Sequence, residues 1–373
     1  MPSKTLSSVS ANKISNFFNY NNLYLRWLLV IAVITASCLW RNVDGLVGDD
    51  GAFFLKYAEN MTEGFFWFYN PESGPVWGAS APLYPLLIAP LLKFGVDPVI
   101  AIKVIGIALL NAAGLLGYEY FARDKSSYGF IFVVLLALNT NIIYNGIAGL
   151  ETPLTVFLIS WIVYDIRNYE QSKAKSGRSF LSIIKVPIII GILSINKIDL
   201  IPFAFSLVIA YCFVVKSYKE RIIAILSPLI ILLSFHLFAL IYFGFPLPNS
   251  FLTKMLHQNH LTKSISHDWI LNDLKSISII VLMTTVMVII AIFIEFVKYL
   301  LRANSARYQL IPISFIPTGL CLSFLFIYFF LGYSLKPPFE PYTWYVAPIN
   351  FAACYLSTMF VVAVDSKIVL RRV

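Results

Sequence analysis

Two adjacent carboxylates, Asp49 and Asp50, follow the first apolar run of the chain and begin an amphipathic stretch. A carboxylate within hydrogen-bond reach of an alcohol accepts its proton while the alcohol attacks an electrophile, and this general-base help is worth about 10² to 10⁴ in rate. Aspartate also solvates loops and caps helices, which is the structural alternative for both residues. The pair is the first candidate for proton transfer, with Asp50 slightly preferred.

Other charged side chains stand where apolar runs begin and end. Glu151 begins one run, and the sequence Asn196-Lys197-Ile198-Asp199 separates two others. Glu151 is either an acid favoured by a helix dipole or a group that holds a lysine or a ligand. Asp199 is either part of a site or simply the partner of Lys197, because charges near membrane depth usually pair.

The composition identifies the medium in which these groups work. Hydrophobic residues make up 59% of the 373 residues and charged residues only 13%, with a mean hydropathy of +0.78. Soluble proteins contain about 45–50% apolar and about 25% charged residues, so this composition excludes a soluble enzyme. The net charge of +9 comes from short basic clusters between apolar runs, which is typical of membrane topology and excludes a nucleic-acid partner.

The apolar runs predict an all-α polytopic membrane protein with about ten transmembrane helices, each of about 20 residues. They lie at about 23–41, 99–121, 127–146, 150–166, 183–197, 199–215, 221–243, 276–297, 309–332 and 345–364. Basic residues collect on the cytoplasmic side of membranes. Their distribution here predicts that both termini are cytoplasmic, and that 82–94, which contains three prolines, lies in the outer interface as an amphipathic helix.

This topology leaves two sizeable outer loops, at about 42–98 and 244–275, and only short cytoplasmic loops without a phosphate-binding glycine motif. We expect residues 1–373 to form a single transmembrane domain without a soluble C-terminal domain. The aromatic residues 65–69, with Trp77 and Tyr84, are expected to anchor the first loop at the membrane interface. The histidines of the second loop, His257, His260 and His267, match no metal motif.

Five stretches of the chain resemble a known family. These are the run from Asp49 to Asn60, then Gly78-Ala79-Ser80-Ala81-Pro82-Leu83, Gly149-Leu150-Glu151-Thr152, Asn196-Lys197-Ile198-Asp199, and the segment from Tyr242 to Lys254. Together they resemble, in order, the multi-span GT-C glycosyltransferases, and most of all the terminal arabinofuranosyltransferases of the mycobacterial cell wall. The resemblance covers about residues 20 to 260. The family has Arg-Pro-Glu or Arg-Pro-Asp where this chain has Lys197, Ile198 and Asp199.

The resemblance implies a GT-C-like bundle that transfers a sugar, with arabinofuranose as the family's example, from a polyprenyl-phosphate carrier to an acceptor hydroxyl. Asp50 or Asp49 would be the general base. Lys254, Lys197 and Lys56 would bind the donor phosphate, although a lysine lacks the fork of an arginine. The residues expected to position the sugar or the acceptor are Glu151, Asn249, Asp199 and Ser80.

The implied partners are the polyprenyl-phosphate sugar, membrane lipid, and a glycan, lipid or secreted-protein acceptor. The implied location is the bacterial plasma membrane, with the active site on the extracytoplasmic side. No cofactor is expected, and metal dependence is left open.

Two alternatives remain. A lipid or sugar transporter would place ionisable residues in broken helices near the middle of the membrane. A polymerase or ligase of surface polysaccharide would share an outer active site but not the Asp49-Asp50 loop.

Overall fold

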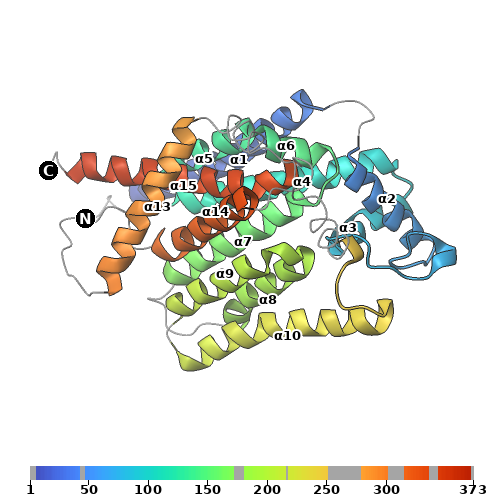
Figure 1. Ribbon diagram of the computed structural model, residues 1–373. Coiled ribbons are helices and arrows are strands. Elements are labelled where there is room, and N and C mark those ends of the chain that lie inside the picture. Colours follow the sequence, from blue (N-terminus) through green and yellow to red (C-terminus); the bar gives the residue numbers. More distant parts are fainter. Residues whose placement is uncertain are drawn as a thin grey trace.

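Most of the chain that the computed structural model describes is helical. This part comprises residues 6–42, 47–171, 180–215, 217–250, 279–300, 315–335 and 343–370, and its regular elements are helices that assemble into one elongated bundle (Figure 1). The predicted all-α architecture is confirmed. Lys254 and the three histidines of the second loop lie outside the described residues.

Every predicted apolar run coincides with a helix or a pair of helices. The bundle contains α1 (Leu6–Trp40), α4 (Pro98–Ala122), α5 (Ser126–Leu138), α6 (Thr140–Ile147), α7 (Thr152–Gln171), α8 (Phe180–Asn196), α9 (Ile201–Val214), α10 (Tyr218–Phe243), α13 (Ile279–Leu300), α14 (Ile316–Leu335) and α15 (Thr343–Leu370). The first loop forms α2 (Asp49–Thr62), the short η1 (Pro71–Ser73) and α3 (Leu83–Lys93), and η3 (Ile198–Leu200) joins α8 to α9.

Several of these helices are long and apolar enough to cross a membrane. Within the described ranges there are four, in α1, α4, α10 and α15, or five if α5 and α6 count as one bent span. The chain is therefore a multi-pass membrane protein. Other helices, such as α8 and α9, are apolar but shorter than a full span.

The run at 127–146 is not the single straight helix that was predicted. The Asn139 side chain accepts a hydrogen bond from the backbone N–H of Ile142 at 3.1 Å and so caps α6. The axes of α5 and α6 bend by 65° at this residue. An asparagine competes with the helical hydrogen-bond pattern and favours a new helix start, which explains the break.

Polar side chains concentrate at the two ends of the bundle. We call the end that carries α2 and α3 the loop end. The opposite end, which we call the basic end, carries Arg26, Arg123, Lys125, Arg167 and Lys185, and these side chains bond to Ser126, Asn168, Asp365, Asp124 and Asp165.

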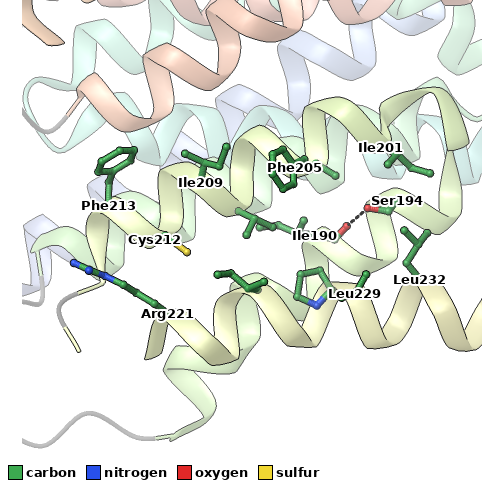
Figure 2. Close-up of a pocket in the computed structure, with 14 residues that line it drawn as sticks. Ile190, Ser194, Ile201, Phe205, Ile209, Cys212, Phe213, Arg221, Leu229 and Leu232 are labelled. Atoms are coloured by element: carbon green, nitrogen blue, oxygen red, sulfur yellow. Dashed lines mark hydrogen bonds between the residues drawn. The ribbon is translucent and has the colours of Figure 1, made fainter. Parts of the chain in front are cut away.

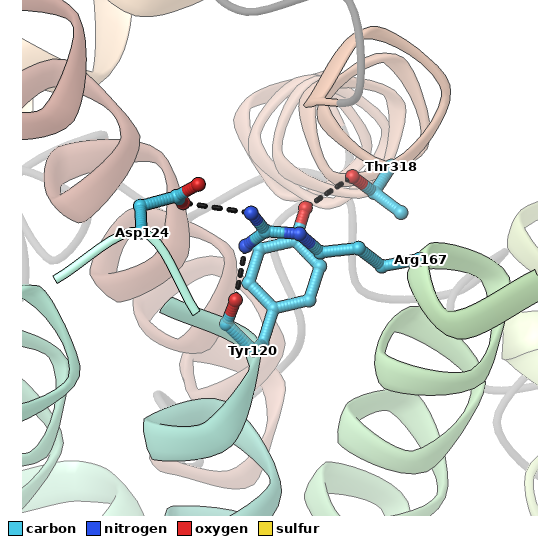
Figure 3. A network of polar contacts seen from close by, with 4 residues as sticks. All are labelled: Tyr120, Asp124, Arg167 and Thr318. Atoms are coloured by element: carbon cyan, nitrogen blue, oxygen red, sulfur yellow. Dashed lines mark hydrogen bonds and ion pairs between the residues drawn. The ribbon is translucent and has the colours of Figure 1, made fainter. Parts of the chain in front are cut away.

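Arg167 joins three helices at the basic end (Figure 3). Its guanidinium donates to the Asp124 carboxylate at 2.7 Å and to the backbone carbonyl of Tyr120. It also lies over the rings of Tyr120 and Phe315, 4.7 and 4.6 Å from their centroids. The Tyr120 hydroxyl in turn bonds to Thr318 at 2.6 Å. This network fixes α4, α7 and α14 to one another far from the loop end.

Candidate functional site

A buried ion pair lies at the loop end. The Lys197 ammonium donates to the Glu151 carboxylate at 2.9 Å, and the two side chains are only 4% and 3% exposed. Withdrawing two charges from water is costly, so a buried pair is a weak source of stability and a candidate for a functional role. The expectation that Glu151 holds a lysine is confirmed.

The two charges meet because of where their helices begin and end. Glu151 immediately precedes α7, and Lys197 immediately follows α8. These helices pack side by side in opposite directions, so the start of one adjoins the end of the other. The helix dipole favours an acid at the first position and a cation at the second. The local backbone therefore supports the charged state of both groups.

The first turn of α2 packs directly on the turn before Glu151. The Gly48 N–H donates to the carbonyl of Ala148 at 2.8 Å. A Cβ on Gly51 would lie 2.7 Å from that same oxygen, so only glycine allows this approach. Asp49 is exposed and Asp50 half-buried in this turn. Both acids therefore border the turn that ends at Glu151.

Neither acid is the N-cap of α2. Gly48 holds that position without a side-chain hydrogen bond, and the acids follow in the first turn. The helix dipole favours acids there too, so their position is compatible with a structural role and with an anionic base.

The rest of the first loop is pinned over α2 by Tyr57. Its hydroxyl donates to the Val76 carbonyl at 2.9 Å and accepts the N–H of Gly78 at 3.2 Å. Burial raises the pKa of Tyr57 to about 12, so the phenol stays protonated near neutral pH. The backbone N–H of Asn249 donates to the Trp77 carbonyl at 2.8 Å and ties the segment after α10 to this loop.

Two buried polar atoms near the ion pair have no hydrogen-bond partner among the residues that the structure describes. One is the hydroxyl oxygen of Tyr84, on α3, whose side chain is 0% exposed. The other is the Oδ1 atom of Asn196, next to Lys197, whose Nδ2 donates to Thr155 at 3.3 Å. Burial, and then the nearby Glu151 carboxylate, raise the pKa of Tyr84.

Trp77 and Tyr84 correct one sequence prediction. They were expected to anchor the loop at the membrane interface, but they are 3% and 0% exposed. Both pack inward, Trp77 against Phe235 of α10 and Tyr84 against Phe54 of α2. Phe65, Phe66 and Tyr69 are exposed and remain compatible with anchoring.

The other predicted site residues lie at varying distances from the pair. Lys56 and Ser80 are half-buried on α2 and just before α3. The acid paired with Lys197 at 2.9 Å is Glu151, while Asp199 lies near Tyr328 of α14. Asn249 is exposed and reaches the site region through its backbone bond to Trp77.

Sequence reasoning missed Tyr84 and Asn196 as polar groups of the site. Asn196 belongs to the Asn196-Lys197-Ile198-Asp199 motif, in which only the charged residues were predicted to act in the site. Tyr84 follows Pro82 and Leu83 in an apolar stretch at the start of α3, and no local sequence signal shows that it faces inward.

An apolar groove begins next to the site. It has a volume of about 500 Å³ and lies between α8, α9 and α10 (Figure 2). Ser194, three residues before Lys197, lies at one end, and Arg221 lies at the other. Apolar side chains such as Ile190, Phe205 and Leu229 form the walls. The groove therefore runs from the ion pair toward the basic end.

Within the described part of the chain, no three His, Cys, Asp or Glu side chains are grouped so that they could hold a metal ion.

No protein-family description matches this sequence, and no curated protein is significantly similar to it. Two crystal structures of ArnT from Cupriavidus metallidurans have a similar fold. The one bound to undecaprenyl phosphate gives a TM-score of 0.57 at 14% identity, covering 92% of this chain and 60% of ArnT. The apo structure gives 0.53 at 13% identity, covering 95% and 60%. This chain thus spans about 60% of the length of the ArnT chains, and it shares with them a GT-C-like bundle of helices.

Proposed function

We propose that the protein is a membrane glycosyltransferase that moves a sugar from a polyprenyl-phosphate carrier to an acceptor hydroxyl. The observation that carries the proposal is the buried pair of Glu151 and Lys197 beside the acidic first turn of α2, at one end of a bundle with the fold of ArnT. One of the similar ArnT structures is bound to undecaprenyl phosphate.

Asp50 or Asp49 acts as the base in this proposal. The acceptor oxygen forms a bond to the anomeric carbon as the aspartate accepts its proton. The bond between that carbon and the phosphate oxygen breaks, and its electron pair stays on the lipid phosphate. The half-buried Asp50 is the better candidate, since partial burial keeps water from competing for the proton.

Lys197 stabilises the charge that develops on the leaving phosphate. A hydrogen bond from a charged donor contributes about 1.5–3 kcal/mol, and a preorganised cation at a buried site needs no reorganisation as the charge appears. Glu151 holds the ammonium in place through the 2.9 Å bond. Lys56 and Lys254 are further candidates for the phosphate, while Asn249, Asp199 and Ser80 are candidates for contacts to the sugar or acceptor.

The apolar groove between α8, α9 and α10 holds the isoprenoid tail in this proposal. The end of the groove at Ser194 is about one helical turn from Lys197. A lipid whose phosphate binds Lys197 therefore has its tail next to this end of the groove. The groove wall is formed by side chains such as Phe205 and Leu229, which a hydrocarbon chain can cover.

We further propose that the sugar is a pentose such as arabinofuranose, because the motifs of the first outer loop resemble those of the terminal arabinofuranosyltransferases. The acceptor is a glycan, lipid or secreted protein of the cell envelope. A panel of polyprenyl-phosphate sugars offered with envelope acceptors will identify both partners.

The loop end is proposed to face the extracytoplasmic side, because the basic residues gather at the opposite end. Single cysteines replacing exposed Asn70 and Lys125 in a variant without the four native cysteines will test this. A membrane-impermeant maleimide added to intact cells should label the cysteine at 70 and not the cysteine at 125. The reverse pattern would invert the proposed orientation.

The central experiment compares wild-type protein with Asp49→Asn and Asp50→Asn in a reconstituted transfer assay. Loss of transfer in one variant, with carrier binding retained, would identify the base. Glu63→Gln is the matched control, because it removes an exposed acid at the other end of α2. If no sugar leaves any carrier, but labelled lipid crosses the bilayer equally with all variants, the transporter alternative replaces the transferase.

A further inference from the structure

The hydroxyl group of Tyr84 lies in the candidate site and makes no contact among the described residues that explains its burial. The side chain is 0% exposed, and its hydroxyl has no hydrogen-bond partner in the described part of the chain. Leaving such a group unsatisfied destabilises the folded protein. Buried hydroxyls usually have a partner, and a ligand bound beside the ion pair would supply one to Tyr84.

The position of Tyr84 limits which ligand that could be. Its ring packs edge-on against Phe54 of α2, with centroids 5.3 Å apart, so the ring is fixed between α2 and α3. The helix that carries Tyr84, α3, contacts α8, which ends immediately before Lys197. Burial, and then the Glu151 carboxylate, raise the pKa of the phenol. The phenol is therefore neutral at working pH and able to donate a proton to a hydrogen bond.

Lys197 is paired with Glu151 at 2.9 Å. An anion that approaches this lysine also approaches the Glu151 carboxylate and is repelled by it. A neutral donor beside the pair offsets that repulsion without adding a further buried charge. A tyrosine hydroxyl fulfils this requirement, whereas a second lysine would carry its own desolvation cost.

We propose that the Tyr84 hydroxyl donates a hydrogen bond to the phosphate group of the polyprenyl carrier, next to Lys197. This inference rests on the proposed function and adds a binding residue to its phosphate site. Tyr84 would hold the phosphate in both the sugar-loaded and the free carrier. The residue would not exchange a proton with the substrate.

The test is direct binding of two lipids, undecaprenyl phosphate and undecaprenol, to the purified protein. The two ligands share the tail and differ in the phosphate alone. Tyr84→Phe should weaken binding of undecaprenyl phosphate by about 10- to 100-fold, the range expected for one hydrogen bond to a charged group. Binding of undecaprenol should stay unchanged.

Tyr118→Phe is the matched control. Tyr118 is 1% exposed, and its hydroxyl also lacks a partner among the described residues, but it lies on α4 toward the basic end. Removing its hydroxyl should change neither affinity. This control separates loss of a buried hydroxyl from loss of the phosphate contact.

Each result decides between the two proposals. Equal phosphate affinity of wild type and Tyr84→Phe, or an equal loss for both lipids, overturns the assignment of Tyr84. Phosphate binding that depends on Tyr84 in a protein that transfers no sugar supports the assignment and contradicts the transferase. A wild type that does not bind undecaprenyl phosphate contradicts both.

Discussion

Glu151 and Lys197 stand 46 positions apart in the sequence and form one contact in the fold. Sequence motifs identified both residues, but the sequence offered the nearby Asp199 as a partner for the lysine. Which acid holds Lys197 depends on how the start of α7 and the end of α8 meet, and motif spacing carries no information about that.

The pair makes a prediction about stability. Glu151→Gln or Lys197→Met removes one member of a buried ion pair, and each should lower the free energy of unfolding by about 3–5 kcal/mol. The double variant should lose less than the sum, because it leaves no unpaired charge. Unfolding in mixed micelles titrated with SDS will measure all three.

Lys125→Met is the control for this comparison of single and double variants. Lys125 pairs with Asp365 at 3.3 Å, but the two side chains are 59% and 35% exposed. Such a pair contributes no more than about 1 kcal/mol. Strictly additive losses at Glu151 and Lys197 would mean that the two charges act independently.

Tyr84 shows what residue types alone do not reveal. A tyrosine in an apolar loop next to a membrane is normally an interfacial anchor, and that interpretation was wrong here. The residue turns inward because α3 packs on α2, a tertiary contact without a local sequence signal.

Helices follow the apolar runs of this chain, so most helix ends were predictable to within several residues, although α1 begins at Leu6, well before the predicted run at 23–41. The exceptions come from side chains that form local hydrogen bonds, such as Asn139 at the break between α5 and α6. The contact of α2 with the turn at Ala148 was also not predictable, because it depends on a close approach at Gly51.

The close approach of α2 to the turn at Ala148 predicts that replacing Gly51 with alanine lowers the free energy of unfolding, which is opposite to the usual effect in a helix. In an open helix, Gly→Ala stabilises by about 1 kcal/mol. At Gly51 the added Cβ would meet Val47 at 2.6 Å and the Ala148 carbonyl at 2.7 Å. Gly51→Ala should therefore destabilise the protein by about 1–3 kcal/mol and displace the acids of α2, so that sugar transfer falls while lipid binding persists.

Gly48→Ala is the comparison for this element. Gly48 has a φ of −62°, and an added Cβ would lie 3.5 Å from the same carbonyl oxygen, an ordinary contact. Gly48→Ala should lower the free energy of unfolding by only about 1 kcal/mol, because alanine is a weaker N-cap than glycine. Thermal unfolding and transfer rate should be measured on both variants, and a stabilised Gly51→Ala would show that α2 is not held tightly against the turn.

At the scale of the whole molecule, the bundle separates its polar chemistry into two ends joined by apolar helices. The basic end is built from ion pairs such as Arg167 with Asp124, which fix helices. The loop end carries the acids of α2 and the buried pair. The separation could be predicted from composition and from the distribution of charge along the chain. Both are properties of the whole sequence and do not depend on which side chains contact one another.

The groove links the two ends, and it predicts how the protein responds to the length of a lipid. Ala204 on α9 lines the groove and is 3% exposed. Ala204→Phe would fill part of the space beside a bound tail. Losing burial of only two CH₂ groups, at about 0.8 kcal/mol each, weakens binding roughly tenfold.

This substitution should therefore raise KM about tenfold for a donor with an undecaprenyl tail. A donor with two isoprene units does not extend past the groove entrance, so its KM should change little. Ala108→Phe is the control, because it adds the same ring at an exposed position of α4 outside the groove. If Ala204→Phe affects long and short donors alike, the tail follows another path, and the groove serves the packing of α8, α9 and α10 instead.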